Sequence, residues 1–143
     1  MGKIIELTNH KLVSSSQDGS IIFYCKDNNN FYKKDFSIKV SPYNGPLMQI
    51  KNNEICYYEV PGGVLYFFDF QNKKNIAQIN NISVTNCIWD SLLMMSKDLL
   101  LATGAGKLTI ININSYSIIR IIDVYGLKHN LIQLQIILML LVY

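Results

Sequence analysis

The chain has 143 residues, of which 50% are hydrophobic and 16% are charged, and its formal net charge is +3 at pH 7. This composition excludes a disordered, highly charged tail, and the length is sufficient for one domain with a hydrophobic core. The 12 lysines and the single arginine are scattered along the chain, which argues against the clustered basic surface of a nucleic-acid-binding protein.

The first unit of the chain, residues 3–40, contains four runs rich in β-branched and aromatic residues, as expected of β-strands. These runs cover residues 4–7, 11–16, 20–24 and 31–40. Asp18-Gly19 separates the second run from the third, so we expect a tight hairpin turn there. An Asn-rich turn at residues 27–30 precedes the fourth run.

Two further units, residues 45–82 and 87–125, repeat this order of strands and turns. Their expected strands are residues 47–50, 54–60, 64–68 and 76–82, then 88–95, 99–103, 107–111 and 117–124. The hairpin turns are Gly62-Gly63 and Ala105-Gly106. The second turn positions are 19, 63 and 106, which gives steps of 44 and 43 residues. Residues 131–143 are expected to begin a fourth unit, with its first strand at 135–140.

A unit of four antiparallel strands in about 40–45 residues is typical of one blade of a β-propeller. Such a sheet buries both faces only by stacking on its neighbours, which fits the continuous apolar run Leu99–Ala102. We therefore predict an all-β fold: a single partial β-propeller over residues 1–143, with about three blades and the first strand of a fourth. Because closed propellers have about 4 to 8 blades, we expect a truncated or longer protein, whose open sheet edges would permit self-association.

The units resemble WD40 repeats. The stretch Leu12–Tyr24 is similar to that family's second strand, the following turn and the third strand, and Leu100–Gly104 is similar to the same second strand in the third unit. The family's Gly-His dipeptide is missing, and its Trp-Asp dipeptide is replaced by Tyr24-Cys25, Phe68-Asp69 and Ile111-Asn112. The repeats are therefore degenerate, and a kelch, NHL or regulator-of-chromosome-condensation type of propeller stays open.

The sequence offers little chemistry for catalysis. Residues 102–107 resemble a phosphate-binding loop, but Leu108 stands where that motif needs Ser or Thr. The two histidines, His10 and His129, have no paired ligand nearby in the sequence, so we expect no metal, no cofactor and no enzymatic activity. The cysteines at positions 25, 56 and 87 lie in apolar runs without a CxxC motif and are interpreted as buried thiols of an intracellular, cytoplasmic protein.

The expected function is that of a non-catalytic scaffold which binds protein or peptide partners through the loops of a rigid propeller. Trp89, the only tryptophan, is a candidate partner-binding residue, with packing between blades as the alternative. The alternative function is a propeller enzyme whose site is completed by blades outside this sequence. Residues 131–143 are almost wholly apolar but shorter than the about 20 residues of a membrane-spanning helix, so no membrane association is expected, although a tail anchor stays open.

Overall fold

The computed structural model describes residues 3–16, 18–40, 44–59, 63–82, 92–104 and 107–123, and over these ranges it contains twelve β-strands and no helix. The strands are β1 (Ile4–Glu6), β2 (Leu12–Ser15), β3 (Ser20–Lys26), β4 (Tyr32–Lys39), β5 (Asn44–Lys51), β6 (Glu54–Glu59), β7 (Val64–Asp69), β8 (Lys74–Ile79), β9 (Leu92–Met94), β10 (Leu99–Gly104), β11 (Lys107–Asn112) and β12 (Ser117–Asp123).

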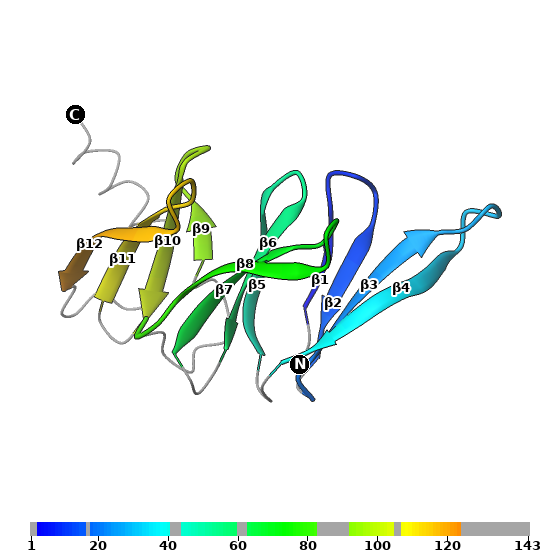
Figure 1. Cartoon of the computed structure of the whole chain (residues 1–143), viewed down its shortest axis with the longest axis horizontal. Coiled ribbons are helices and arrows are strands. Elements are labelled where there is room, and N and C mark those ends of the chain that lie inside the picture. Colours follow the sequence, from blue (N-terminus) through cyan, green and yellow to red (C-terminus); the bar gives the residue numbers. More distant parts are fainter. Residues whose placement is uncertain are drawn as a thin grey trace.

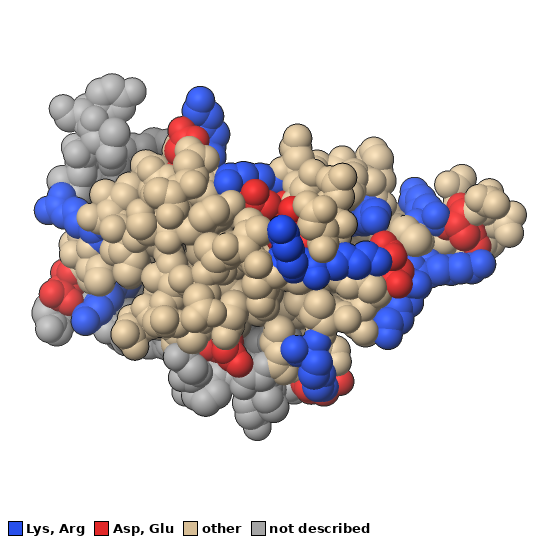
Figure 2. Space-filling model, viewed as in Figure 1, with Lys and Arg blue, Asp and Glu red and all other residues tan. Residues whose placement is uncertain are grey.

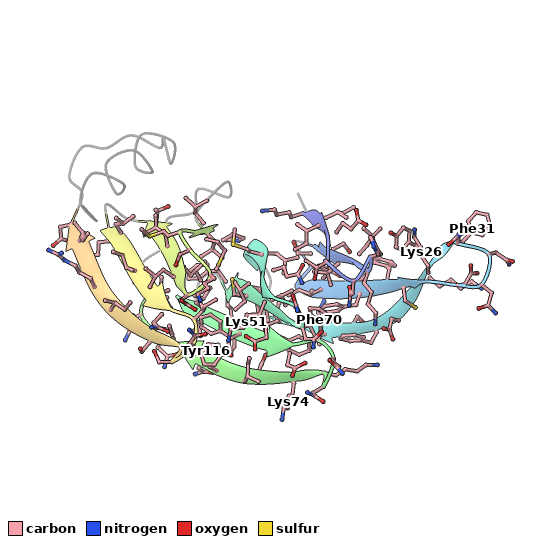
Figure 3. The ribbon with its side chains drawn as sticks, turned by 90° about the horizontal axis from the view of Figure 1, so that it is seen from above. Lys26, Phe31, Lys51, Phe70, Lys74 and Tyr116 are labelled. Carbon is pink, nitrogen blue, oxygen red and sulfur yellow. The ribbon has the colours of Figure 1, made fainter. Side chains whose placement is uncertain are left out.

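These strands form three four-stranded antiparallel sheets, each built from four consecutive strands of the chain. We call them the first sheet (β1–β4), the second sheet (β5–β8) and the third sheet (β9–β12). Figure 1 shows the three sheets side by side, with the second sheet in the middle. Seen from above, the last strands β4, β8 and β12 lie along one side of this row and the first strands lie along the other (Figure 3). The predicted order of strands and hairpins is confirmed over the described residues.

The first and second sheets are held together by a core of aromatic and aliphatic side chains. Phe23 is fully buried there and stacks on Phe36, with the two ring centroids 4.3 Å apart. Phe68 of the second sheet lies 5.8 Å from the Phe23 ring, so aromatic contacts cross the junction directly. The other buried members of this core are Leu7, Val13, Ile21, Leu47, Ile55, Tyr57 and Phe70.

A second core lies between the second and third sheets. Leu65 and Phe67 of β7 are fully buried there, as are Leu100 of β10 and Ile111 of β11. Successive residues of β6 alternate between the two cores: Ile55 joins the first, and the next residue joins the second. The central strands β6 and β7 of the middle sheet are thus covered on both faces, which explains why they are apolar without the alternation of a half-exposed strand.

Each sheet repeats the same backbone irregularities. A register shift falls in the third strand opposite the last one, between residues 23 and 24, 67 and 68, and 110 and 111. The turn that follows contains one non-glycine residue with positive φ, namely Asn30, Lys73 or Tyr116. These three positions are separated by two steps of 43 residues, so the repeat seen in the sequence is also a repeat of backbone conformation.

Candidate interaction site

Two of the turn glycines identified in the sequence analysis lie in the hairpin between the second and third strands of a sheet. Each of them also accepts a hydrogen bond from a residue that follows the last strand of the same sheet. Gly19 and Gly63 have φ values of 85° and 67°, which residues with a Cβ adopt only at a cost. The carbonyl of Gly19 accepts a hydrogen bond from the N–H of Val40 at 2.8 Å, and that of Gly63 accepts one from Ile82 at 3.0 Å. These hydrogen bonds tie the turn to the chain that leaves the last strand of the same sheet.

Asp18 has a similar structural role. Its Oδ1 atom accepts a hydrogen bond from the backbone N–H of Ser20 at 2.9 Å, and its Oδ2 atom accepts one from the hydroxyl of the same serine at 3.0 Å. These hydrogen bonds lower the pKa of Asp18, and Lys39 lies 3.6 Å away. The remaining predicted positions, Gly62, Trp89, Ala105 and Gly106, lie outside the described residues, as do residues 131–143.

At the other end of each sheet, an acidic or amide side chain caps the turn between the third and fourth strands. The Oδ1 atom of this residue lies 2.8–3.1 Å from the backbone N atoms of the turn; the three residues are Asp27, Asp69 and Asn112. The comparison with the WD40 pattern placed this position of the first unit at Cys25. In the structure, β3 extends to Lys26, so Cys25 lies within the strand and Asp27, two positions later and just after β3, caps the turn; Asp69 and Asn112 are instead the last residues of β7 and β11.

The capped turns of the second and third sheets reach across to the preceding sheet. In the second sheet, the Lys73 Nζ atom lies 3.6 Å from an Asp35 carboxylate oxygen and 4.5 Å from the centroid of the Phe36 ring. Both of these partners belong to β4 of the first sheet. A cation placed over an aromatic face next to a carboxylate links the two sheets at their outer strands.

The turn of the third sheet places Tyr116 in an equivalent position on the second sheet (Figure 3). Its hydroxyl accepts a hydrogen bond from the Lys51 Nζ atom at 3.0 Å and donates one to Glu54 at 2.8 Å. The ring of Tyr116 lies 4.9 Å from the ring of Phe67. Burial alone would lower the pKa of Lys51, but the hydrogen bonds to Tyr116 and Glu54 raise it, so this lysine stays charged. The cluster is therefore a fixed polar junction between sheets.

The corresponding turn of the first sheet has no described sheet beneath it. The hairpin β3–β4 projects from the molecule in Figure 1, and Figure 3 places Phe31 at its tip. The Phe31 side chain is 70% exposed, and the Lys26 Nζ atom lies 5.4 Å from the centroid of the neighbouring Tyr32 ring. Phe31 was not identified from the sequence as a candidate site residue. Its position directly after the Asn-rich turn is the feature of the sequence that could have indicated an exposed aromatic side chain.

Charges of both signs are mixed on the described surface rather than gathered by sign, and several form ion pairs. Lysines and acids lie next to one another across the face seen in Figure 2. Among the ion pairs, Lys33 lies 2.8 Å from Asp27 and Lys11 lies 3.1 Å from Asp35. A surface of this kind provides local polar contacts but no extended field of one sign.

The metal-ligating and nucleophilic side chains of the described residues matter here, because an enzyme site would need them. No group of three or more His, Cys, Asp or Glu side chains among them is placed to hold a metal ion. The His10 ring pairs with Glu6 at 3.3 Å in an exposed turn. Cys56 is fully buried, and burial raises the pKa of its thiol to about 12, so this thiol is not a nucleophile at neutral pH. Nor do these parts of the chain include a helix long and apolar enough to cross a membrane.

Comparison with known proteins identifies the fold. No model of a known protein family matches the sequence, and no curated protein matches it. Among solved structures, the chain is similar to Kluyveromyces lactis Hsv2, with a TM-score of 0.58 and 18% identity over 86% of this chain and 38% of that one. Hsv2 with its loop 6CD replaced by a Gly-Ser linker gives 0.59 and 16%, over 84% of this chain and 38% of that one. Kluyveromyces marxianus Hsv2 gives 0.57 and 14%, over 85% and 38%.

The fold is that of a partial β-propeller. The Hsv2 proteins are β-propellers, and the chain spans a little over a third of the length of these relatives in structure. Three stacked four-stranded sheets with the last strands on one side are the arrangement expected of three consecutive blades. At this level of identity, the similarity concerns the fold alone.

Proposed function

We propose that the chain is a non-catalytic, WD40-like propeller module which binds protein or peptide partners. The observation that carries this proposal is that the apolar side chains pack between the sheets. The space between neighbouring sheets is filled by two packed cores, so the chemistry left for a partner lies on the turns and on the outer strands. Turns held on a rigid framework are common positions for binding residues.

The WD40-like character is supported by the turn residues. The turn between the third and fourth strands is capped in each sheet by an equivalent residue: Asp27, Asp69 or Asn112. The WD40 repeats that the sequence resembles carry an aspartate at this place, as part of their Trp-Asp dipeptide. The Gly-His dipeptide of that pattern is missing from all three units, so the proposal is a degenerate member of this repeat class.

The mixture of positive and negative charges favours a protein or peptide over a nucleic acid, which would require a continuous basic surface. Cys25 and Cys56 are free thiols, and the second is inaccessible in the fold. Free cysteines of this kind suit a reducing compartment, so we place the protein inside the cell, in the cytoplasm.

The proposal is tested by site-specific photo-crosslinking in the source cells. A benzophenone side chain is introduced at Phe31, on the exposed turn, or at Asn52, on the turn between β5 and β6. The matched control carries the same group at Ile4, which is 71% exposed on β1, a first strand that is neither a turn nor an outer strand. We expect discrete protein adducts, identified by mass spectrometry, from at least one turn position and not from the control. A folded chain that gives no protein adduct from either turn would overturn the proposal.

A further inference from the structure

The last strand of each sheet presents an open edge. Within the described residues, β4, β8 and β12 each pair with one neighbour only. In an antiparallel pair, alternate residues of an edge strand direct their N–H and C=O groups away from the neighbour, and these groups can pair with another extended chain. The three edges occupy equivalent places along one side of the molecule (Figure 3), so their side chains can be compared directly.

Two of these edges carry lysines, which oppose the addition of another strand. In β4, three of the eight residues are lysines, and Phe36 and Ile38 are half-buried against the first core. In β8, Lys74 and Gln78 are exposed, whereas Ile76 is half-buried and Ile79 is buried. Apart from Tyr32 at the start of β4, the exposed residues of both strands are polar.

The edge strand β12 differs from the other two. It contains four isoleucines in its seven residues and no lysine. The exposed fractions are 55% for Ile119, 51% for Ile121 and 38% for Ile118. A register shift next to an edge can hinder pairing, but all three sheets have one at the same place, so it does not account for the difference.

Among the described residues of the third sheet, the exposed large apolar side chains all belong to this strand. Leu101 and Leu108, at the centre of the sheet face that turns away from the second sheet, are already buried. The shape of the available surface is therefore a strand edge and not a broad sheet face, and the ligand that fits a strand edge is another extended backbone.

We propose that the β12 edge binds an extended peptide of a partner protein, in which apolar residues alternate with acidic ones. This inference rests on the proposed function and names the chemistry of the partner. The apolar residues would pack on Ile119 and Ile121, and an acidic residue would pair with Arg120, which is exposed and has no acidic partner among the described residues.

A second copy of the chain fits this edge less well. In a twofold antiparallel pair of β12 strands with the longest overlap, Ser117 faces Asp123 and each Arg120 faces the Arg120 of the other copy. Like charges placed directly opposite in a sheet are destabilising. The net charge of +3 on each chain also favours an acidic ligand over self-association.

The test uses the full-length chain and a fluorescein-labelled octapeptide of alternating valine and glutamate, with binding followed by fluorescence anisotropy. The I121K variant puts a charge on the edge, and I4K is the matched control because Ile4 is 71% exposed on β1, in the first sheet. We expect I121K to weaken binding by about tenfold or more and I4K by less than about twofold. R120E should weaken the binding of this peptide and strengthen that of an alternating valine–lysine peptide.

A second measurement separates strand addition from nonspecific adhesion and needs no variant. Methylation of alternate backbone nitrogens of the peptide removes its hydrogen-bond donors, so we expect binding to be lost. Equal affinity for the methylated peptide, no binding by the wild-type chain, or an equal loss with I4K would each overturn the inference. So would sedimentation of the wild-type chain as a dimer that I121K dissociates. Protein adducts from the turns of a chain that fails these peptide tests would leave the proposed function intact and refute only this inference.

Discussion

Replacement of Phe23 by alanine tests whether the first two sheets stack as described. Phe23 lies in β3 with none of its side chain exposed, and its ring contacts three other aromatic rings. One of these, Phe36, belongs to the same sheet, while Phe68 and Phe70 come from the second. The substitution F23A therefore removes packing both within a sheet and across the junction.

The expected cost follows from this burial. Truncation of a buried phenylalanine to alanine lowers the free energy of unfolding by about 3–5 kcal/mol, because apolar contact is lost and a cavity remains. The stacked geometry with Phe36, at 4.3 Å between centroids, adds about 0.5–1.5 kcal/mol. The total approaches the whole stability of a small domain, about 5–15 kcal/mol, so the variant should be largely unfolded under mild denaturing conditions.

Urea unfolding followed by circular dichroism measures this loss. The control is F31A, the same substitution at a side chain that is 70% exposed, and it should change the free energy of unfolding by no more than about 0.5 kcal/mol. With a denaturant dependence of about 1–3 kcal/mol per molar urea, the two variants should differ by more than about 1 M in midpoint. Equal midpoints for F23A and F31A would refute the stacking of the first two sheets.

Three further predictions concern the junctions and turns. Y116F removes the hydroxyl that bonds Lys51 and Glu54 and should lower the free energy of unfolding by about 1 kcal/mol, measured by urea unfolding, whereas no change would mean that this junction is not formed in solution. The backbone N–H of Asn72 lowers the pKa of Asp69 below its ordinary value of 3.8, so the stabilisation is complete above that value and is lost as the pH falls through the lowered pKa. D69N, which copies the natural Asn112, should therefore reduce the loss of stability in acid, and an unchanged acid unfolding profile would contradict this. In a chain whose other two cysteines are replaced by serine, Cys56 should react with a maleimide only as fast as the protein opens, so rapid labelling of the native chain would show that its burial is wrong.

The local structure of this protein was predictable because it is encoded in neighbouring residues. Positive φ at a turn requires glycine or a residue that tolerates it, so the dipeptide Asp18-Gly19 by itself indicates a hairpin. Strand runs such as residues 64–68 and 107–111 were likewise located from their composition. The number of residues between turns then gave the repeat, and from the repeat followed the class of fold.

Part of the candidate site was not predictable in this way. The comparison of the first unit with the repeat pattern placed the turn-capping residue at Cys25, because fixed spacing does not detect that the capping residue of this unit lies two positions later, after a longer strand. Phe31 and Ile121 looked like ordinary strand residues, since nothing nearby in the sequence distinguishes an exposed isoleucine of β12 from a half-buried one such as Ile76 of β8.

By itself, the sequence determined where strands and turns fall, since φ preferences and side-chain branching act within a few residues. Only the tertiary structure decided which face of each strand is covered and which polar groups meet. Lys51 and Tyr116 are 65 residues apart in the chain yet lie 3.0 Å apart, because stacking the second and third sheets to bury their apolar faces brings the two turns together. The same packing buries Leu100 and Ile111 at the centre of the third sheet and leaves the edge of β12 exposed.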